Sequence, residues 1–228
     1  MAYALLGLLL LAALLLPQLW VRWAMKRHGA HRPDFPGTGG ELARHLLDRA
    51  GLQGVRVERL QRAMGDHYDP QARAVRLSPD NHDGRSVTAV AVAAHEVGHA
   101  LQHAAGFRPL ALRTRLARLA RRVEFAGALL LLAAPLVMAV ARNPALLLVE
   151  IGGGLAVLCV GVVLQLAALP VGQDASCRRA LPILRDGSLP PADLPAARQV
   201  LRAAALTYVA GALVGLLNVA RWLRMLRF

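Results

Sequence analysis

The sequence predicts a mainly α-helical membrane protein with about four transmembrane helices and a small cytosolic α+β domain. Of its 228 residues, 56% are hydrophobic and 18% are charged, whereas soluble domains are about half apolar and a quarter charged. The formal net charge of +13 favours contact with anionic lipid headgroups. Four apolar runs approach the length of about 20 residues that crosses a bilayer. They are Ala2 to Val21, Phe125 to Ala141, Ala145 to Val171 and Ala203 to Ala220.

These runs divide the chain into five parts. Basic loops stay on the cytosolic side of a membrane, which predicts that both polar segments between the runs face the cytosol. Three arginines follow the last apolar run, so this helix is expected to be transmembrane or interfacial. The parts are an N-terminal transmembrane anchor (1–21), a cytosolic domain (22–122), a transmembrane hairpin (123–171), a second cytosolic segment (172–202) and the C-terminal helix (203–228).

Two helices are predicted in the first cytosolic segment. Thr38 and Glu41 form a capping-box pattern ahead of an apolar helical period, and Gly51 closes the helix. A second helix begins after Ser86, is rich in valine and alanine, and ends at Gly106.

The strands of this domain lie between the two helices. The stretch 55–60 alternates between polar and apolar residues. Residues 66–70 and 74–78 are expected to pair as a hairpin that turns near Pro70. Together these stretches suggest a small sheet, with an exposed edge formed by residues 74–78 to which an extended peptide could add.

The motif HEVGH lies on the second helix. It places His95 and His99 one helical turn apart on the same face, where both imidazoles can bind one Zn²⁺ ion. Glu96 is offset by one residue and can act as the general base on a metal-activated water. Gly98 would leave space beside the metal. The motif therefore predicts a zinc-dependent peptidase, although surface histidines on an ordinary helix are the simpler alternative.

The surrounding sequence resembles the YugP-type neutral zinc metallopeptidases, multi-pass membrane proteins of bacteria. The matching runs are Asp66–Pro70, Val75–Ser78, Asp83–Ser86, Ala93–Gln102, Leu169–Val171, Asp174–Ser176 and Ala205–Ala210. The resemblance implies a zincin-like domain, a gluzincin-type site akin to that of the HtpX-type membrane proteases, and a location in the bacterial inner membrane.

The third zinc ligand is where the sequence departs from this family. The family places a glutamate directly after Leu-Pro-Val, and this chain has Gly172 there. Asp174, two residues further on, is the leading candidate to replace it, so that the segment 172–202 would complete the metal site. His103, Cys177 or a site with only two protein ligands are the alternatives.

His67 and Tyr68 complete the set of candidate catalytic residues. They lie on the strand next to the expected substrate edge, where their side chains could donate to the oxyanion of the reaction. A polar strand face explains the two residues equally well.

The leading functional hypothesis is a membrane-embedded zinc metallopeptidase that hydrolyses peptide bonds of protein substrates at the cytosolic membrane face. Its partners would be the lipid bilayer and a peptide or protein substrate. The alternative is a catalytically impaired pseudopeptidase that serves as a protein-binding or quality-control scaffold, and Gly172 is the feature that raises it. A nucleic-acid partner is not expected, because the sequence has no aromatic stacking platform or helix-turn-helix pattern.

Overall fold

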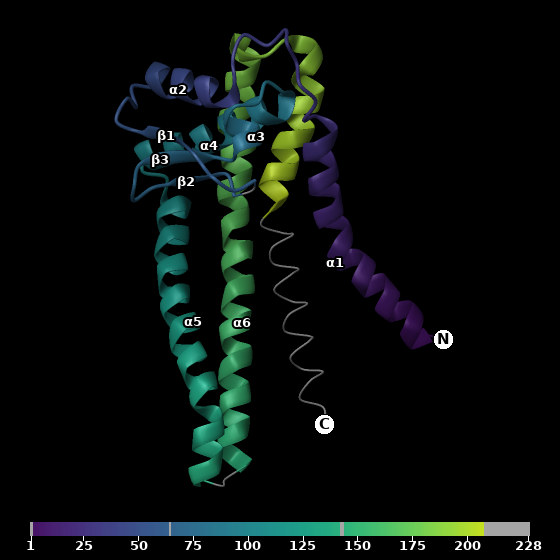
Figure 1. Cartoon of the computed structure of the whole chain (residues 1–228), viewed down its shortest axis with the longest axis vertical. Coiled ribbons are helices and arrows are strands. Elements are labelled where there is room, and N and C mark those ends of the chain that lie inside the picture. The colour runs from purple at the N-terminus through teal and green to yellow at the C-terminus, as the bar shows by residue number, and fades with distance from the viewer. Residues whose placement is uncertain (1, 64, 142–143, 208–228) are drawn as a thin grey trace.

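The computed structural model describes residues 2–63, 65–141 and 144–207. Residues 28–63, 65–107 and 174–207 form the part called the head, and a long helical pair extends from it (Figure 1). The pair consists of α5 (Arg108–Ala141) and α6 (Pro144–Gln173), which lie side by side and extend away from the head. The N-terminal helix α1 (Ala2–Arg27) joins the head at its C-terminal end and diverges from α6 toward the N-terminus.

Both predicted helices of the head are confirmed. Helix α2 spans Gly39–Arg49, and its capping box is complete: the Glu41 N–H donates to Thr38 Oγ1 (3.2 Å), and the Thr38 N–H donates to Glu41 Oε2 (2.7 Å). Helix α4 spans Val87–Ala104. Its N-cap is Ser86, whose hydroxyl accepts the Ala89 N–H at 3.0 Å. Gly106 follows the helix with a φ of 63°, a conformation that glycine adopts without strain.

The sheet has three strands in the order β1-β3-β2. The predicted hairpin is confirmed, since β2 (His67–Asp69) pairs antiparallel with β3 (Ala74–Leu77). Strand β1 (Arg56–Arg59) adds parallel on the other side of β3. The expectation of an exposed edge at residues 74–78 is therefore wrong, because β3 is the central strand and both of its edges are paired. Between the hairpin and α4 lies the short helix α3 (Pro79–His82).

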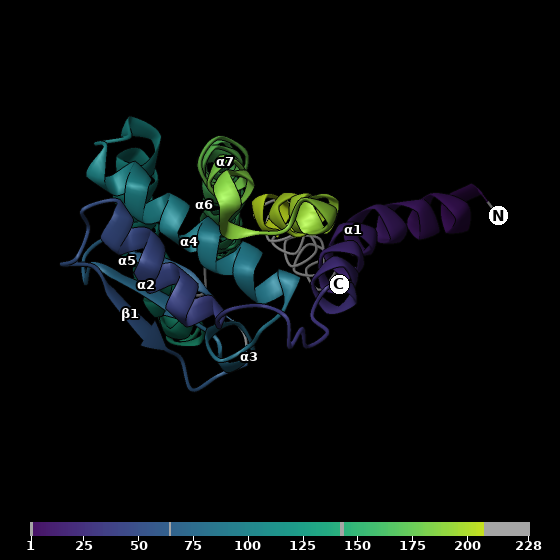
Figure 2. The same ribbon diagram turned by 90° about the horizontal axis from the view of Figure 1, so that it is seen from above.

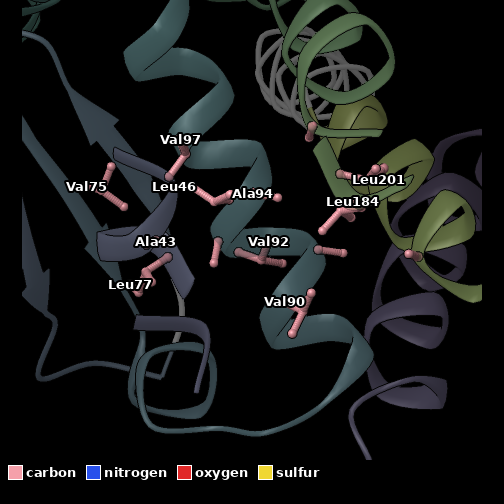
Figure 3. Packing of buried hydrophobic residues seen from close by; sticks show 14 of the residues in the cluster. Ala43, Leu46, Val75, Leu77, Val90, Val92, Ala94, Val97, Leu184 and Leu201 are labelled. Atoms are coloured by element: carbon pink, nitrogen blue, oxygen red, sulfur yellow. The ribbon is translucent and has the colours of Figure 1, made fainter. Parts of the chain in front are cut away.

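Helix α4 runs through the middle of the head, between α2 and the sheet on one side and the C-terminal segment on the other (Figure 2). It is buried along almost its whole length, and the buried residues include polar ones, His95, Glu96, His99 and Gln102, among the valines and alanines. Figure 3 shows Leu46, Val75 and Leu77 packed on one side of it, and Leu184 and Leu201 on the other.

The C-terminal segment is irregular before it becomes helical again. It consists of a π-helical turn η1 (Asp174–Ala180), α7 (Leu181–Ile183), a second π-type turn η2 (Leu184–Ser188) and the 3₁₀ turn η3 (Pro191–Asp193). Residues 194–207 are helical. Polar contacts tie this segment to the end of α1: Arg32 donates to Asp193 at 2.8 Å, and His28 Nε2 lies 2.8 Å from Gln199 Oε1.

The fold is mainly helical with a small sheet, but the prediction of about four transmembrane helices is wrong. Within the part of the chain that the structure describes, no helix is both long enough and apolar enough to cross a membrane. A spanning helix must keep an apolar composition over about 20 residues. Helix α5, for example, carries arginines through its first half and has an apolar run only in its second. Most of the predicted run at 203–220 lies outside the described residues.

Candidate metal centre

His95, Glu96 and His99 line a cleft of about 1240 Å³ in the head. Their helix α4 forms one wall, and the other walls come from the C-terminal end of α1, strand β2, the loop around α3 and the helical residues 194–207. The cleft is large enough for a stretch of peptide rather than only a small molecule. Further residues that line it near the three motif side chains are Asp66, His67, Tyr68, Ser78 and Arg113.

The two imidazoles of the motif lie edge to face, with ring centroids 4.7 Å apart and an interplanar angle of 79°. Each histidine is only 4% exposed. Burial lowers the pKa of His95 well below its usual value, with the His99 and Arg113 charges adding to the effect. Burial likewise lowers the pKa of His99, to about 4. Both rings are therefore neutral at physiological pH, which is the form that binds metals.

The hydrogen bonds of Gln102 define the tautomer of His99. The amide Nε2 of Gln102 donates both of its protons, to the Val171 carbonyl at 2.9 Å and to Asp174 Oδ2 at 2.8 Å. Its Oε1, 2.9 Å from His99 Nδ1, must then accept, so Nδ1 carries the ring proton. His99 Nε2 is left with a lone pair, is buried and has no hydrogen-bond partner within the described residues. Buried polar atoms are rarely left unpaired, and a metal ion would satisfy this one.

The tautomer of His95 follows from Ser176. The Ser176 hydroxyl donates to the Leu201 carbonyl at 2.8 Å, and its oxygen lies 2.8 Å from His95 Nδ1. A hydroxyl has one proton, so its oxygen must accept from His95 Nδ1–H. His95 therefore also presents an Nε2 lone pair. The residues present thus fit a Zn²⁺ ion, because both histidines have the tautomer in which Nε2 is free to bind it.

Glu96 has a different electrostatic environment from the histidines. Burial raises the pKa of Glu96 to about 8, and the Asp66 charge adds to the rise. A hydrogen bond from the Tyr68 backbone and the charge of Arg113 act in the opposite direction. A carboxyl group with a pKa near neutrality can both accept and donate a proton at physiological pH, as general acid–base catalysis requires.

The candidates for the third ligand lie apart from this arrangement. Asp174 Oδ2 accepts from Gln102 and from Arg179 Nε (2.9 Å), and Asp174 lines a second cleft of about 510 Å³ together with Cys177. Cys177 is exposed. His103 is also exposed, and its Nδ1 lies 2.8 Å from the Tyr68 hydroxyl. Among the described residues, no group of three or more His, Cys, Asp or Glu side chains could hold a metal. Gly172 is buried near the end of α6.

His67 and Tyr68 both line the main cleft. The backbone N–H of Tyr68 donates to the Glu96 carboxyl group, and the Tyr68 hydroxyl is hydrogen-bonded to His103. His67 Nδ1 lies 2.6 Å from the Gly65 carbonyl. The structure therefore brings both residues to the cleft, with the Tyr68 hydroxyl and the His67 Nδ1 atom already in hydrogen bonds.

The sequence analysis assigned no role to the residues behind the histidines, Gln102 and Ser176. Both lie inside motif runs, at the end of HEVGHALQ and in Asp-Ala-Ser, which was the available signal. Gly98 was given a different role from the one it has. A Cβ atom at this position would lie 2.7 Å from the Ala175 carbonyl oxygen, so the glycine admits the backbone of η1 rather than a metal.

A buried helix that presents two histidines one turn apart, with a glutamate between them and a peptide-sized cleft in front, is the arrangement of the helical zinc peptidases. A family model described as "Putative neutral zinc metallopeptidase" matches residues 3–227, and the chain belongs to this family. It is 40% identical over 185 residues to the "Putative membrane protease YugP" of Bacillus subtilis (strain 168), covering 81% of this chain and 79% of that relative. The predicted resemblance is confirmed. No solved structure matches the chain.

Proposed function

We propose that this chain is a zinc-dependent peptidase that hydrolyses peptide bonds of protein substrates in the main cleft. The observation that carries the proposal is the buried Nε2 atom of His99, which lacks a partner within the described residues and lies beside His95 and Glu96. Membership in a zinc metallopeptidase family supports the choice of metal and reaction.

His95 and His99 would hold the ion through their Nε2 atoms. Bound zinc supplies the Lewis acid that activates water and polarises a peptide carbonyl. Glu96 receives the proton of the attacking water and returns it to the leaving amine. The Tyr68 backbone hydrogen bond holds the Glu96 carboxyl group in place for both transfers.

Strand β2 is the proposed binding edge for the substrate. It is an outer strand of the sheet and its residues line the cleft, so an extended peptide can add to it through main-chain hydrogen bonds. His67 lies on this edge, but its Nδ1–H already donates to the Gly65 carbonyl, so it could donate to the oxyanion only with both ring nitrogens protonated. The Tyr68 hydroxyl could donate to the oxyanion only after breaking its hydrogen bond with His103.

We also propose that the protein acts at the cytosolic face of a bacterial membrane. The Bacillus relative is described as a membrane protease, and the net charge of +13 suits the anionic cytosolic leaflet. Large apolar side chains are exposed on the three long helices, a feature of surfaces that bind membranes or proteins. They are Leu15, Leu16, Leu19 and Trp23 on α1, Leu112, Leu119, Phe125 and Leu129 on α5, and Val163 and Leu166 on α6. Flotation with vesicles of anionic or neutral lipids would test this location.

Zinc analysis of the purified full-length protein tests the peptidase proposal. The wild type should carry zinc, and His95→Ala and His99→Ala should lose it. Glu96→Gln should keep its zinc, because Glu96 is not a ligand, and lose peptidase activity by about 100-fold or more. His45→Ala, which removes an exposed histidine on α2, is the matched control and should change neither quantity. A wild-type protein without zinc or activity would contradict the proposal and favour the pseudopeptidase alternative.

A further inference from the structure

The polar groups behind both motif histidines come from the same part of the chain. Val171, Asp174 and Ser176 lie within six residues of one another, around the junction of α6 and η1. From the contacts of this junction we infer that Ser176 and the pair Gln102–Asp174 are positioning residues, which fix the Nδ1–H tautomers of His95 and His99, and that Asp174 acts through Gln102 instead of binding the metal. The inference rests on the proposed function insofar as it assigns zinc binding to the two histidines.

The hydrogen bonds around His99 form a chain with a defined direction. His99 Nδ1–H donates to Gln102, and Gln102 donates to Asp174 and to the Val171 carbonyl. Gln102 is 0% exposed, so it has no water with which to exchange these partners. A flipped Gln102 amide would point its NH₂ group at His99 and its oxygen at two acceptors. The partners Asp174 and Val171 therefore exclude the flip, and with it the wrong tautomer of His99.

Asp174 is itself held in place. Arg179 Nε donates to the same Oδ2 atom that accepts from Gln102, at 2.9 Å, and the Arg179 guanidinium lies 5.8 Å from the centre of the Phe107 ring. Asp174 faces the second cleft, and it does not line the cleft that contains His95, Glu96 and His99. These contacts suit a carboxylate that supports a histidine from behind.

At His95 the support is a direct contact with Ser176, and it does not involve the hydrogen bonds of Gln102 and Asp174. Ser176 is 0% exposed, and its only hydroxyl proton goes to the Leu201 carbonyl. The serine oxygen is thereby restricted to accepting from His95 Nδ1–H. Leu201 lies in the helical residues 194–207, so this helix sets the orientation of Ser176 and, through it, that of His95.

Gly98 makes both contacts possible. The Ala175 carbonyl oxygen would be 2.7 Å from a Cβ atom at residue 98, so only glycine lets η1 approach α4 this closely. Ala175 lies between Asp174 and Ser176. The glycine of HEVGH therefore determines how the chain supports both of the histidines that flank it in the motif.

Imidazole ¹⁵N NMR on the zinc-free full-length protein tests the tautomers directly. The wild type should show both motif histidines as single Nδ1–H tautomers. Gln102→Leu should produce a mixture at His99 and leave His95 unchanged, whereas Ser176→Ala should do the reverse. Thr114→Val, which removes a hydroxyl that donates to the Leu110 carbonyl in α5, is the matched control and should alter neither ring. Unchanged tautomers in both Gln102→Leu and Ser176→Ala would overturn the inference.

Zinc affinity, measured by competition with a chelator, separates the two roles of Asp174. Gln102→Leu and Ser176→Ala should each weaken zinc binding by about 10- to 100-fold, the usual effect of removing a group that orients a metal-binding histidine. Asp174→Asn keeps an acceptor for Gln102 and should bind zinc within a few-fold of the wild type. If Asp174→Asn loses zinc as severely as His99→Ala, Asp174 is a ligand and the inference is wrong. A wild type that binds no zinc would refute the proposed function, while the NMR result would still decide the tautomers.

Discussion

The two sides of α4 serve different residues of the same motif. The sheet side (residues 39–86) packs apolar side chains such as Leu47 and Leu77 against the helix and reaches Glu96 through the backbone of Tyr68. The C-terminal side (residues 170–207) also contributes apolar side chains, but it places Ser176 and Asp174 behind the histidines of the motif. Burial perturbs all three motif side chains, but Glu96 is bonded from the sheet side through the Tyr68 backbone, whereas the Nδ1 atoms of the histidines are bonded to Ser176 and, through Gln102, to Asp174 on the C-terminal side.

A change on the sheet side should alter the free energy of unfolding without altering zinc affinity. A change on the C-terminal side should alter zinc affinity as well.

The largest expected effect on stability is on the sheet side. Leu47 is fully buried, so Leu47→Ala should lower the free energy of unfolding by about 2–5 kcal/mol through lost burial and a cavity. Zinc affinity of the folded protein should stay at the wild-type value. Leu112→Ala is the matched control, because Leu112 is 56% exposed and its truncation should change stability little. Chemical denaturation and chelator competition measure the two quantities, and a large loss of zinc affinity in Leu47→Ala would break the division between the sides.

Gly98→Ala acts at the contact between α4 and the C-terminal side. The added methyl group would meet the Ala175 carbonyl and displace η1, which should cost about 1–3 kcal/mol of stability. Because Ser176 and Asp174 move with η1, zinc affinity should fall too. Gly152→Ala in α6 is the matched control, since a Cβ atom there meets nothing within 4 Å. A destabilised Gly98→Ala protein with unchanged zinc affinity would show that the histidines do not depend on this contact.

The pH dependence of stability should separate the histidines from Glu96 in zinc-free protein. The unfolded state protonates histidine near about pH 6.5, whereas the folded state resists protonation of His99 down to about 4. The histidine contribution to stability is therefore lost as pH falls from about 6.5 toward 4, by on the order of 1–3 kcal/mol. Glu96 acts in the opposite direction, because a pKa raised to about 8 makes folding less favourable as pH rises from about 4.5 to 8.

Glu96→Gln isolates these two contributions. Its unfolding free energy should no longer show the decline attributable to Glu96 between about pH 4.5 and 8, and it should retain the loss caused by the histidines in acid. Denaturant titrations of the wild type and variant over this range measure the difference. Parallel pH profiles for the two proteins would contradict the raised pKa of Glu96.

The smallest expected effect comes from the cap of α2. Thr38→Ala removes the hydroxyl that accepts the Glu41 N–H and should lower the free energy of unfolding by about 1 kcal/mol. Thr38 caps α2, which lies on the sheet side of α4, so zinc affinity should be unaffected. Thermal unfolding with and without zinc provides the measurement. Thr38→Ser, which keeps a hydroxyl, should remain close to the wild type.

Features that depend on near neighbours in the chain could be predicted from the sequence. The caps at Thr38 and Ser86, the glycine after α4, the β2–β3 hairpin and the position of HEVGH on a helix all follow from residues a few positions apart. The same motif runs also identified the family. Composition was less informative, since the apolar runs led to transmembrane helices that are absent from the described part of the chain.

The groups that lie behind the motif histidines could not be predicted from the sequence, because they come from distant parts of the chain. Ser176 is 81 residues from His95, and Asp174 is 72 residues from Gln102, so no local pattern connects them. Its place two residues after Gly172, where the family has a glutamate, made Asp174 a candidate ligand, while its contacts in the fold are with Gln102 and Arg179. Strand β1 pairs with β3 from a distance along the chain as well. This pairing covers the free side of β3 and leaves β2 as the open edge beside the cleft. The pKa of Glu96, raised to about 8, is a consequence of burial, and burial exists only once distant segments have packed around the helix.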